Sequence, residues 1–197
     1  MNSVVINLSR LKPQSVAKVL LALIVSCVLP AVMSGQGKTL KLGIELQGYP
    51  TGAIPGVRAD LFFSDFSKAH VRVGYNIVRH GDAGEHDDER GGGPGFTLGY
   101  DILPLASHRL TVGARCDLWF NQVDWYDILP DDSRIEGTTD VTVLQPTAQA
   151  GYRIPFGEKV ELLPTLALGY EINIKTEGAE VGHGLILLAG FILNYEF

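Results

Sequence analysis

The chain has 197 residues and is acidic, with 16 Lys and Arg against 22 Asp and Glu and a formal net charge of −6. This acidic balance gives no support for nucleic-acid binding, which needs a basic patch or stripe. Of its two cysteines, Cys27 lies in an N-terminal segment that is predicted to be removed, which leaves Cys116 alone. A lone cysteine forms no internal disulfide, so the sequence predicts no disulfide-stapled secreted domain.

Residues Met1–Ser34 have the composition of a secretory signal peptide. Basic residues come first, without an acidic one: Arg10, Lys12 and Lys18. An apolar stretch then runs through Val19–Val28 and ends in small residues around Ser34 and Gly35. The stretch is too short, and too interrupted by Pro30, for a permanent membrane helix. We expect cleavage near Ser34–Gly35, which leaves residues 35–197 as one domain.

One detail of this segment favours a different processing. Ile24-Val25-Ser26-Cys27 resembles a lipoprotein cleavage box, and lipidation at Cys27 would suit a membrane-bound product. Residues 28–33 stay apolar, however, where lipoproteins usually turn polar. Removal of Cys27 with the signal peptide is therefore the preferred interpretation.

After the signal peptide, hydrophobicity repeats with a period of two, which is typical of half-buried strands. Each segment is about long enough for a tilted strand to cross the hydrocarbon layer. The eight predicted strands are Thr39–Gln47, Gly56–Phe63, His70–Arg79, Gly95–Leu103, Arg109–Asn121, Val141–Ile154, Lys159–Asn173 and Gly184–Phe197. Pro146 and Pro164 fall inside two of them and predict a bulge or local break, because each lacks a donor for the ladder.

The connections between these segments are predicted to alternate in length. Three are short: Ser64–Ala69, Pro104–His108 and Pro155–Glu158. On the other side Tyr49–Pro55 alone is brief. The other three connections there are long: His80–Pro94, Gln122–Asp140 and Lys175–His183. Transmembrane barrels have short periplasmic turns, longer external loops and an even strand count. The pattern predicts an antiparallel up-and-down barrel with both termini in the periplasm.

A soluble lipocalin-like barrel is the rival interpretation, since its strands alternate too. The glycines favour the membrane barrel, because they fall on the polar side of the strands: Gly43, Gly74, Gly99, Gly113, Gly151, Gly169 and Gly190. Glycine in a strand marks close approach, which a narrow interior requires and a water-facing surface does not.

Aromatic residues also sort by depth in the predicted barrel. One group is placed near the periplasmic rim: Phe63, Tyr100, Tyr152, Phe156, Tyr195 and Phe197. A second group is placed near the outer rim: Tyr49, Phe96, Phe120, Trp125, Tyr126 and Tyr170. Two such girdles are typical of membrane barrels.

The last segment ends in Tyr195-Glu196-Phe197, with aromatics at its last and third-last positions. Glycine is followed by tyrosine in four of the predicted strands, at Gly74-Tyr75, Gly99-Tyr100, Gly151-Tyr152 and Gly169-Tyr170. This terminus, the alternation and the Gly-Tyr pairs resemble the small eight-stranded outer membrane proteins of the A, X and W type. The resemblance implies an outer-membrane location, contact with lipid and lipopolysaccharide, and recognition of the last strand by the barrel-insertion machinery. It also implies structural, adhesive or small-solute roles, among which the fold does not choose.

Charged residues of both signs are predicted to line the lumen: Lys41, Glu45, Arg58, Asp60, Arg72, Asp101, Arg109, Arg115, Asp117, Arg153, Glu161, Glu171 and Glu196. Buried charges persist when they are paired. Because eight strands leave space only for side-chain filling, a closing salt-bridge plug is preferred over a narrow polar conduit.

No catalytic, cofactor-binding or metal-binding residue is assigned. The loop of residues 80–94 has two histidines and five carboxylates, but their spacing matches no defined site, and a solvated acidic surface explains them. A lipid A-modifying enzyme would need an activated nucleophile, and the serines Ser64, Ser67, Ser107 and Ser133 form no such arrangement with histidine. The sequence favours a non-enzymatic barrel with a structural or surface-interaction role, with a narrow porin or transporter as the alternative.

Overall fold

The computed structural model describes residues 39–81, 84–104 and 109–197. The predicted signal peptide, with Cys27, lies outside the described residues, as do Ser107 and His108. Within these ranges, no helix has the length and hydropathy to cross a bilayer.

The described residues form one antiparallel sheet of nine strands. The strands are β1 (Leu40–Tyr49), β2 (Gly52–Ser64), β3 (Ser67–Gly81), β4 (Asp88–Ile102), β5 (Leu110–Ile128), β6 (Arg134–Tyr152), β7 (Ile154–Phe156), β8 (Val160–Glu177) and β9 (Gly184–Glu196).

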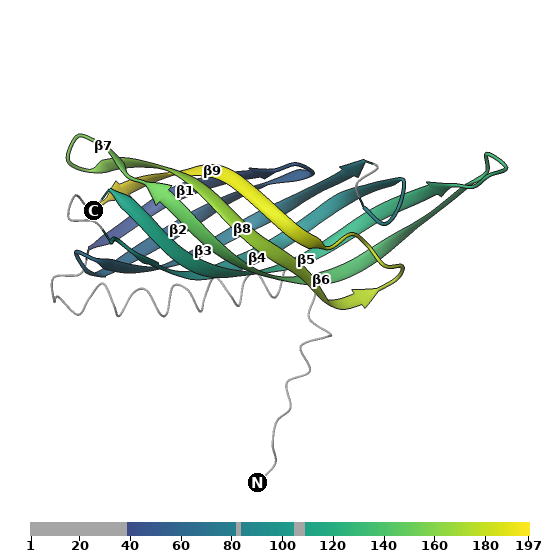
Figure 1. Cartoon of the computed structure of the whole chain (residues 1–197), viewed down its shortest axis with the longest axis horizontal. Coiled ribbons are helices and arrows are strands. Elements are labelled where there is room, and N and C mark those ends of the chain that lie inside the picture. Colours follow the sequence, from purple (N-terminus) through teal and green to yellow (C-terminus); the bar gives the residue numbers. More distant parts are fainter. Residues whose placement is uncertain (1–38, 82–83, 105–108) are drawn as a thin grey trace, which may run out of the picture. The chain divides into compact units, whose positions relative to one another are not determined.

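The sheet closes on itself (Figure 1). Consecutive strands pair from β1 to β6, and the first strand also pairs with the last, β9. The short β7 continues β6 after Arg153, and both pair with β8, so they act as one interrupted strand. The prediction of an eight-stranded antiparallel ring is therefore confirmed.

Polarity in this ring is reversed relative to a soluble protein. Large apolar side chains point outward and are exposed, such as Leu166 at 62% and Leu187 at 57%. Charged side chains point into the lumen, where Arg72 is 1% exposed and Asp117 is 0% exposed. Because strand side chains alternate between faces, each strand contributes to both surfaces. The outer face is suited to lipid, and the soluble lipocalin-like alternative is not supported.

The lumen is narrow enough to require glycine at close approaches. At Gly99 of β4, an added Cβ would overlap the imidazole ring of His70 on the neighbouring β3. This agrees with the expectation that the polar-side glycines make room inside a small barrel.

Two loops predicted to be long are in fact largely strand. β3 runs to Gly81 and β4 begins at Asp88, so most of His80–Pro94 pairs in a ladder, as in Arg79 with Arg90. β5 and β6 likewise extend through Gln122–Asp140 to a tip at residues 129–133.

The third long connection, Lys175–His183, also starts as strand, because β8 continues to Glu177. We call the outward-facing apolar side chains the apolar belt. Apolar alternation stops where the strands leave this belt, although their backbone hydrogen bonds continue. The sequence pattern therefore marked the end of the apolar belt rather than the end of each strand. The predicted alternation of short and long loops is wrong: the extra length lies in strands, and the β5–β6 hairpin projects past its neighbours (Figure 1).

Prolines inside the strands coincide with gaps in the ladders. Pairing between β6 and β8 skips Gln145 and Pro146, and Pro164 lies opposite the interruption between β6 and β7. Pro94 of β4 and Pro55 of β2 coincide with the same kind of gap toward β5 and β3. The predicted local breaks at Pro146 and Pro164 are confirmed, because proline cannot donate to the ladder.

We call the end of the barrel that holds Leu40 and Glu196 the terminal end, and the end that holds the β5–β6 tip the hairpin end. Aromatic side chains are exposed around the terminal end as predicted: Phe63, Tyr100, Tyr152, Phe156, Tyr195 and Phe197.

At the hairpin end the predicted girdle is incomplete. Tyr170 is 49% exposed, and Phe96 and Phe120 are half-buried. Tyr49 and Trp125, by contrast, pack against the apolar core inside the barrel, which corrects their placement on the outer surface. Side chains alternate between the two faces of a strand, and both residues occupy inward-facing positions of their strands.

Candidate functional site

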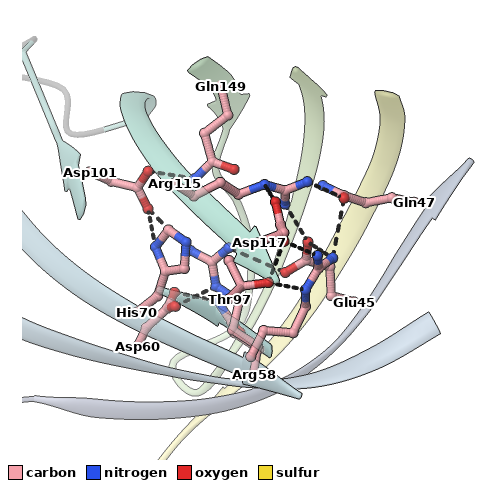
Figure 2. Close-up of polar contacts among 12 residues, drawn as sticks. Glu45, Gln47, Arg58, Asp60, His70, Thr97, Asp101, Arg115, Asp117 and Gln149 are labelled. Atoms are coloured by element: carbon pink, nitrogen blue, oxygen red, sulfur yellow. Dashed lines mark hydrogen bonds and ion pairs between the residues drawn. The ribbon is translucent and has the colours of Figure 1, made fainter. Parts of the chain in front are cut away.

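Nine ionisable side chains fill the middle of the lumen, and each is at most 4% exposed. We call them the central ion-pair network. They come from β1 to β5: Glu45, Arg58, Asp60, Lys68, His70, Arg72, Asp101, Arg115 and Asp117. Figure 2 shows most of them converging from different strands, together with Gln47, Thr97 and Gln149.

Glu45 lies at the centre of one half of this network. Its carboxylate accepts hydrogen bonds from Arg72 Nη1 at 2.7 Å, from Arg115 Nη1 at 2.9 Å and from Arg58 Nη1 at 3.2 Å. Asp117 adds a second carboxylate, 2.5 Å from Arg72 Nη2 and 3.2 Å from Arg115 Nε. Three guanidinium groups are thereby held close together, which is stable only because carboxylates lie between them.

Asp60 and Asp101 form the other half. Asp60 lies 2.5 Å from Arg58 Nε and 2.6 Å from Lys68 Nζ. Asp101 lies 3.1 Å from Arg58 Nη2 and 3.1 Å from His70 Nδ1, and it also accepts a hydrogen bond from Gln149. Arg58 therefore links both halves of the network.

The charges of the central ion-pair network compensate one another. Four carboxylates, from Glu45, Asp60, Asp101 and Asp117, face the cations of Arg58, Lys68, Arg72 and Arg115. An isolated buried charge is strongly unfavourable, so each partner is needed by the others. These side chains fill the middle of the lumen.

A smaller group of charges lies at the terminal end. Lys41 Nζ is 3.1 Å from Glu196 and 3.5 Å from Glu161, which also pairs with Arg153 at 2.5 Å. The ring of Phe62 lies within cation–π distance of Lys41, Lys68 and Arg153.

The hairpin end of the lumen is apolar. Its core is centred on Trp119, which is 0% exposed and whose Nε1 donates to Gln145 at 3.0 Å. We call these residues the apolar layer: Ile54, Trp119, Val123, Val141, Val143, Ala167, Val181, Ile186 and Leu188. The lumen is thus closed by charges in the middle and by packed apolar side chains above them.

Above the apolar layer, His86 joins three segments of the hairpin end. Its Nδ1 lies 2.9 Å from Asp127 Oδ2, its Nε2 lies 2.9 Å from the carbonyl of Glu180, and its ring stacks on Trp125. Partial burial lowers the pKa of His86, but the bonds to Asp127 and Glu180 outweigh it and raise that pKa above its usual range.

Glu89 makes a second junction next to it. Its carboxylate accepts from the backbone N–H of Glu85 at 2.9 Å and of Gly182 at 3.2 Å, and lies 2.7 Å from His80 Nδ1. Burial raises the pKa of Glu89, but these hydrogen bonds, above all from His80, hold it below its usual range. We call His80, His86, Glu89 and Asp127 the latch.

The latch does not form a metal site of the kind considered for residues 80–94. His80 and His86 face different carboxylates, and in residues 39–81, 84–104 and 109–197 no group of three His, Cys, Asp or Glu side chains is placed to hold a metal ion.

The serines of the described ranges face groups other than histidine. Ser64 and Ser67 hydrogen-bond each other at 3.0 Å, and Ser133 donates to Asp131 at 2.6 Å. The geometry in this part of the chain gives no support to the acyl-hydrolase alternative.

Most lumen charges predicted from the sequence lie where they were expected. Glu161 and Glu196 belong to the terminal-end group, and Glu171 and Glu196 are only half-buried. Arg109 is exposed just before β5 begins, so its placement in the lumen is wrong.

Lys68, His70 and Glu89 were not predicted to lie in the lumen. Lys68 was assigned to a turn and Glu89 to a loop, yet both continue the alternation of their strands. Extending the period of two backward from Arg72 and His70 by one step would have found Lys68. For Glu89 that signal is obscured by the glycines at 91–93.

No family model and no curated protein matches the chain. Solved structures of small outer-membrane β-barrels do match it, at low sequence identity, as the sequence resemblance led us to expect. Neisserial surface protein A is 13% identical with a TM-score of 0.47, covering 82% of this chain and 98% of that one.

Two further structures give similar values. A major outer membrane protein from Thermus thermophilus is 13% identical with a TM-score of 0.48, covering 82% of this chain and 100% of that one. Ail, the attachment invasion locus protein of Yersinia pestis, is 6% identical with a TM-score of 0.46, covering 81% and 97%. With TM-scores below 0.5, these similarities do not identify the role of this chain.

Proposed function

We propose that this chain is a non-enzymatic integral protein of the bacterial outer membrane, with a structural or surface-interaction role. The observation that carries the proposal is the closed lumen: a buried, charge-compensated network lies inside an outward-facing apolar belt. A barrel of this kind is anchored in lipid and has no continuous passage for a solute.

The proposed orientation places both termini in the periplasm and the hairpin end outside the cell. Lipid surrounds the belt, and lipopolysaccharide surrounds the outer part of the β5–β6 hairpin. The outward face of that hairpin changes from apolar residues such as Phe120 to polar ones such as Asp124 and Thr138, as expected where a strand leaves the hydrocarbon layer.

The projecting hairpin is the surface we assign to partners. A groove of about 750 Å³ lies on it, lined among others by Asp88, Arg90, Tyr126, Arg134 and Glu136. The Arg134 guanidinium lies 4.0 Å from the ring centre of Tyr126 and 3.1 Å from Glu136. Aromatic and arginine side chains, such as Tyr126 and Arg134, are enriched at protein-contact surfaces.

The C-terminal strand is proposed to deliver the chain to the insertion machinery. Tyr195 and Phe197 are exposed at the terminal end and contact each other edge to face, 5.0 Å apart. Phe197 follows the last residue of β9, so its removal leaves the β1–β9 ladder intact. Deleting Phe197 should therefore lower the outer-membrane yield in cells while the purified chain still folds in detergent.

The first test combines membrane fractionation with heat-modifiability. The unboiled protein from the outer-membrane fraction should migrate faster on a detergent gel than the boiled protein. A soluble protein without a mobility shift would refute the membrane barrel.

A second test separates the closed barrel from the porin alternative. In planar bilayers the purified protein should show no stepwise single-channel conductance, whereas a known porin in the same bilayers does. Reproducible steps from the pure protein would favour a solute pathway. Expression should also leave the acyl number of radiolabelled lipid A unchanged, and a change would revive the enzyme alternative.

Orientation is tested by cysteine accessibility in intact cells. In a Cys116→Ser background, Ser133→Cys at the hairpin tip should react with a membrane-impermeant maleimide. Ser64→Cys at the terminal end should react only after the outer membrane is permeabilised. The reverse pattern would overturn the proposed orientation.

A further inference from the structure

A small cavity lies beneath the latch, at the hairpin end of the lumen. Its volume is about 20 Å³, and polar groups from several strands line it, including Tyr49, Asn121, Glu171 and Asn173. A cavity of this size holds one water molecule or one ion of similar size.

Three side chains at this cavity each carry an oxygen atom that has no hydrogen-bond partner among the described residues. Asn121 is only 6% exposed, and its Oδ1 is unpaired. The Oδ1 of Asn173 is also buried and unpaired, while its Nδ2 donates to the carbonyl of Val181 at 3.0 Å. That bond fixes the amide of Asn173 so that its oxygen is the free group. Buried acceptors without a partner are uncommon in folded proteins, and a bound water molecule or ion accounts for many of them.

The third group is the carboxylate of Glu171. No hydrogen bond or ion pair engages it in the part of the chain that the structure describes, although the neighbouring Glu89 is fully used by His80 and by backbone N–H groups. Tyr49 donates its hydroxyl hydrogen to Asn76 Oδ1 at 2.7 Å, so its oxygen also presents lone pairs. The unpaired atoms are thus oxygens, and one of the three side chains is a carboxyl group.

We infer that this cavity binds one hard metal cation of the sodium or calcium size class through Glu171, Asn121 and Asn173. Carboxylate and amide oxygens are the ligands that such cations take in proteins. The cation supplies the partners that the two amide oxygens lack and balances the charge of Glu171 in a partly buried place.

The cation reaches this site from the hairpin end. Val181 and Gly182 of the β8–β9 connection line the cavity, and the N–H of Gly182 donates to Glu89. The central ion-pair network closes the opposite side of the lumen.

Terbium luminescence tests the site, since terbium replaces calcium at oxygen ligands and Tyr49 lies in the cavity wall as a sensitiser. The refolded barrel in detergent should show sensitised emission that calcium or sodium displaces. Which of the two displaces it at the lower concentration identifies the ion. Glu171→Gln and Asn121→Ala should each weaken terbium binding by about tenfold or more, because both remove a ligand.

Glu136→Gln is the matched control. Glu136 is an exposed carboxylate of the β5–β6 hairpin that pairs with Arg134 instead of lining the cavity, so its replacement should leave the emission unchanged. Each variant is first shown to be heat-modifiable, which establishes that its barrel is folded.

A second measurement uses the unaltered chain alone. Millimolar calcium or sodium should raise its unfolding temperature, because a ligand that binds the folded state stabilises it. No sensitised emission together with no rise in unfolding temperature would overturn the site and leave a water molecule in the cavity. Emission that persists unchanged in folded Glu171→Gln would overturn it as well.

Discussion

His86 stacks on Trp125 with 4.0 Å between ring centres and 10° between the ring planes, while each of its ring nitrogens faces an oxygen. A neutral imidazole donates from only one nitrogen, so both bonds can form at once only when the ring is protonated. The β3–β4 loop, the β5 end and the β8–β9 connection are therefore held together best by the imidazolium form.

The latch should weaken as the pH rises. The pKa of His86 is raised in the folded chain, so the bonds contribute fully below about pH 6.5 and are lost as the pH passes through the raised value. A titration of the His86 ring followed by NMR should give a pKa above that of an unfolded reference peptide. Asp127→Asn should lower it, whereas Asp131→Asn, at the same hairpin tip, should not.

Proteolysis reports what this titration does to the connection. A glutamyl endopeptidase should cleave after Glu180 faster as the pH rises, relative to the same digestion of His86→Ala, whose connection lacks the bond at every pH. A constant ratio between the two proteins across this range would contradict the role of His86. The neighbouring carboxylates of Glu85, Asp87 and Glu89 are present in both proteins, so the comparison isolates His86.

Removing one cation from the central ion-pair network should destabilise the barrel strongly. Arg72→Leu leaves Glu45 and Asp117 buried with fewer partners, for which we expect a loss of about 3–5 kcal/mol. Arg134→Ala breaks an exposed pair with Glu136 and should cost less than about 1 kcal/mol. Urea unfolding in lipid vesicles, followed by the heat-modifiable band, measures both. Equal midpoints would show that the lumen charges are not mutually dependent.

The barrel itself could be predicted from the sequence because its lipid-facing surface and its lumen both impose a period of two on the residues of each strand. Lipid selects apolar side chains such as Leu166 and Leu187 on one face, and the narrow lumen selects charges and glycine on the other. Seven of the nine members of the central ion-pair network were predicted from that alternation, all except Lys68 and His70. Its pairings were not, because they join residues far apart in the chain, such as Glu45 and Arg115.

The ends of the strands and the contacts of the latch could not be predicted from this period of two. Residues 88–94 are polar and rich in glycine, which indicates a loop, yet backbone pairing with β3 and β5 keeps them in strand. Because of this composition, Glu89 was assigned to a loop. The contact of His86 with Asp127 and Glu180 was not predicted, because it joins three separate connections. Sequence spacing carries no information about such distances.

Gly95 makes space for the largest buried side chain of the lumen. A Cβ added to Gly95 would overlap both the Trp119 ring and the carbonyl of Leu118. We expect Gly95→Ala to destabilise the barrel by about 1–3 kcal/mol, because neither the packed ring nor the backbone of β5 can move freely. Gly81→Ala is the control, since nothing lies within 4 Å of its added Cβ. Thermal unfolding in one detergent compares them, and matching unfolding temperatures would contradict the close packing.

The outward face of β5 should be in contact with lipid at Cys116. This side chain is exposed, and its cross-strand neighbours are Leu98 on β4 and Pro146 on β6, which places it within the apolar belt. A fluorophore attached to Cys116 in detergent, and then reconstituted, should be quenched by lipids brominated in their acyl chains. In a Cys116→Ser background, the same fluorophore on Ser133→Cys should be quenched by aqueous iodide instead. Iodide quenching at Cys116 would place this face in water and contradict the reversed polarity on which the membrane barrel depends.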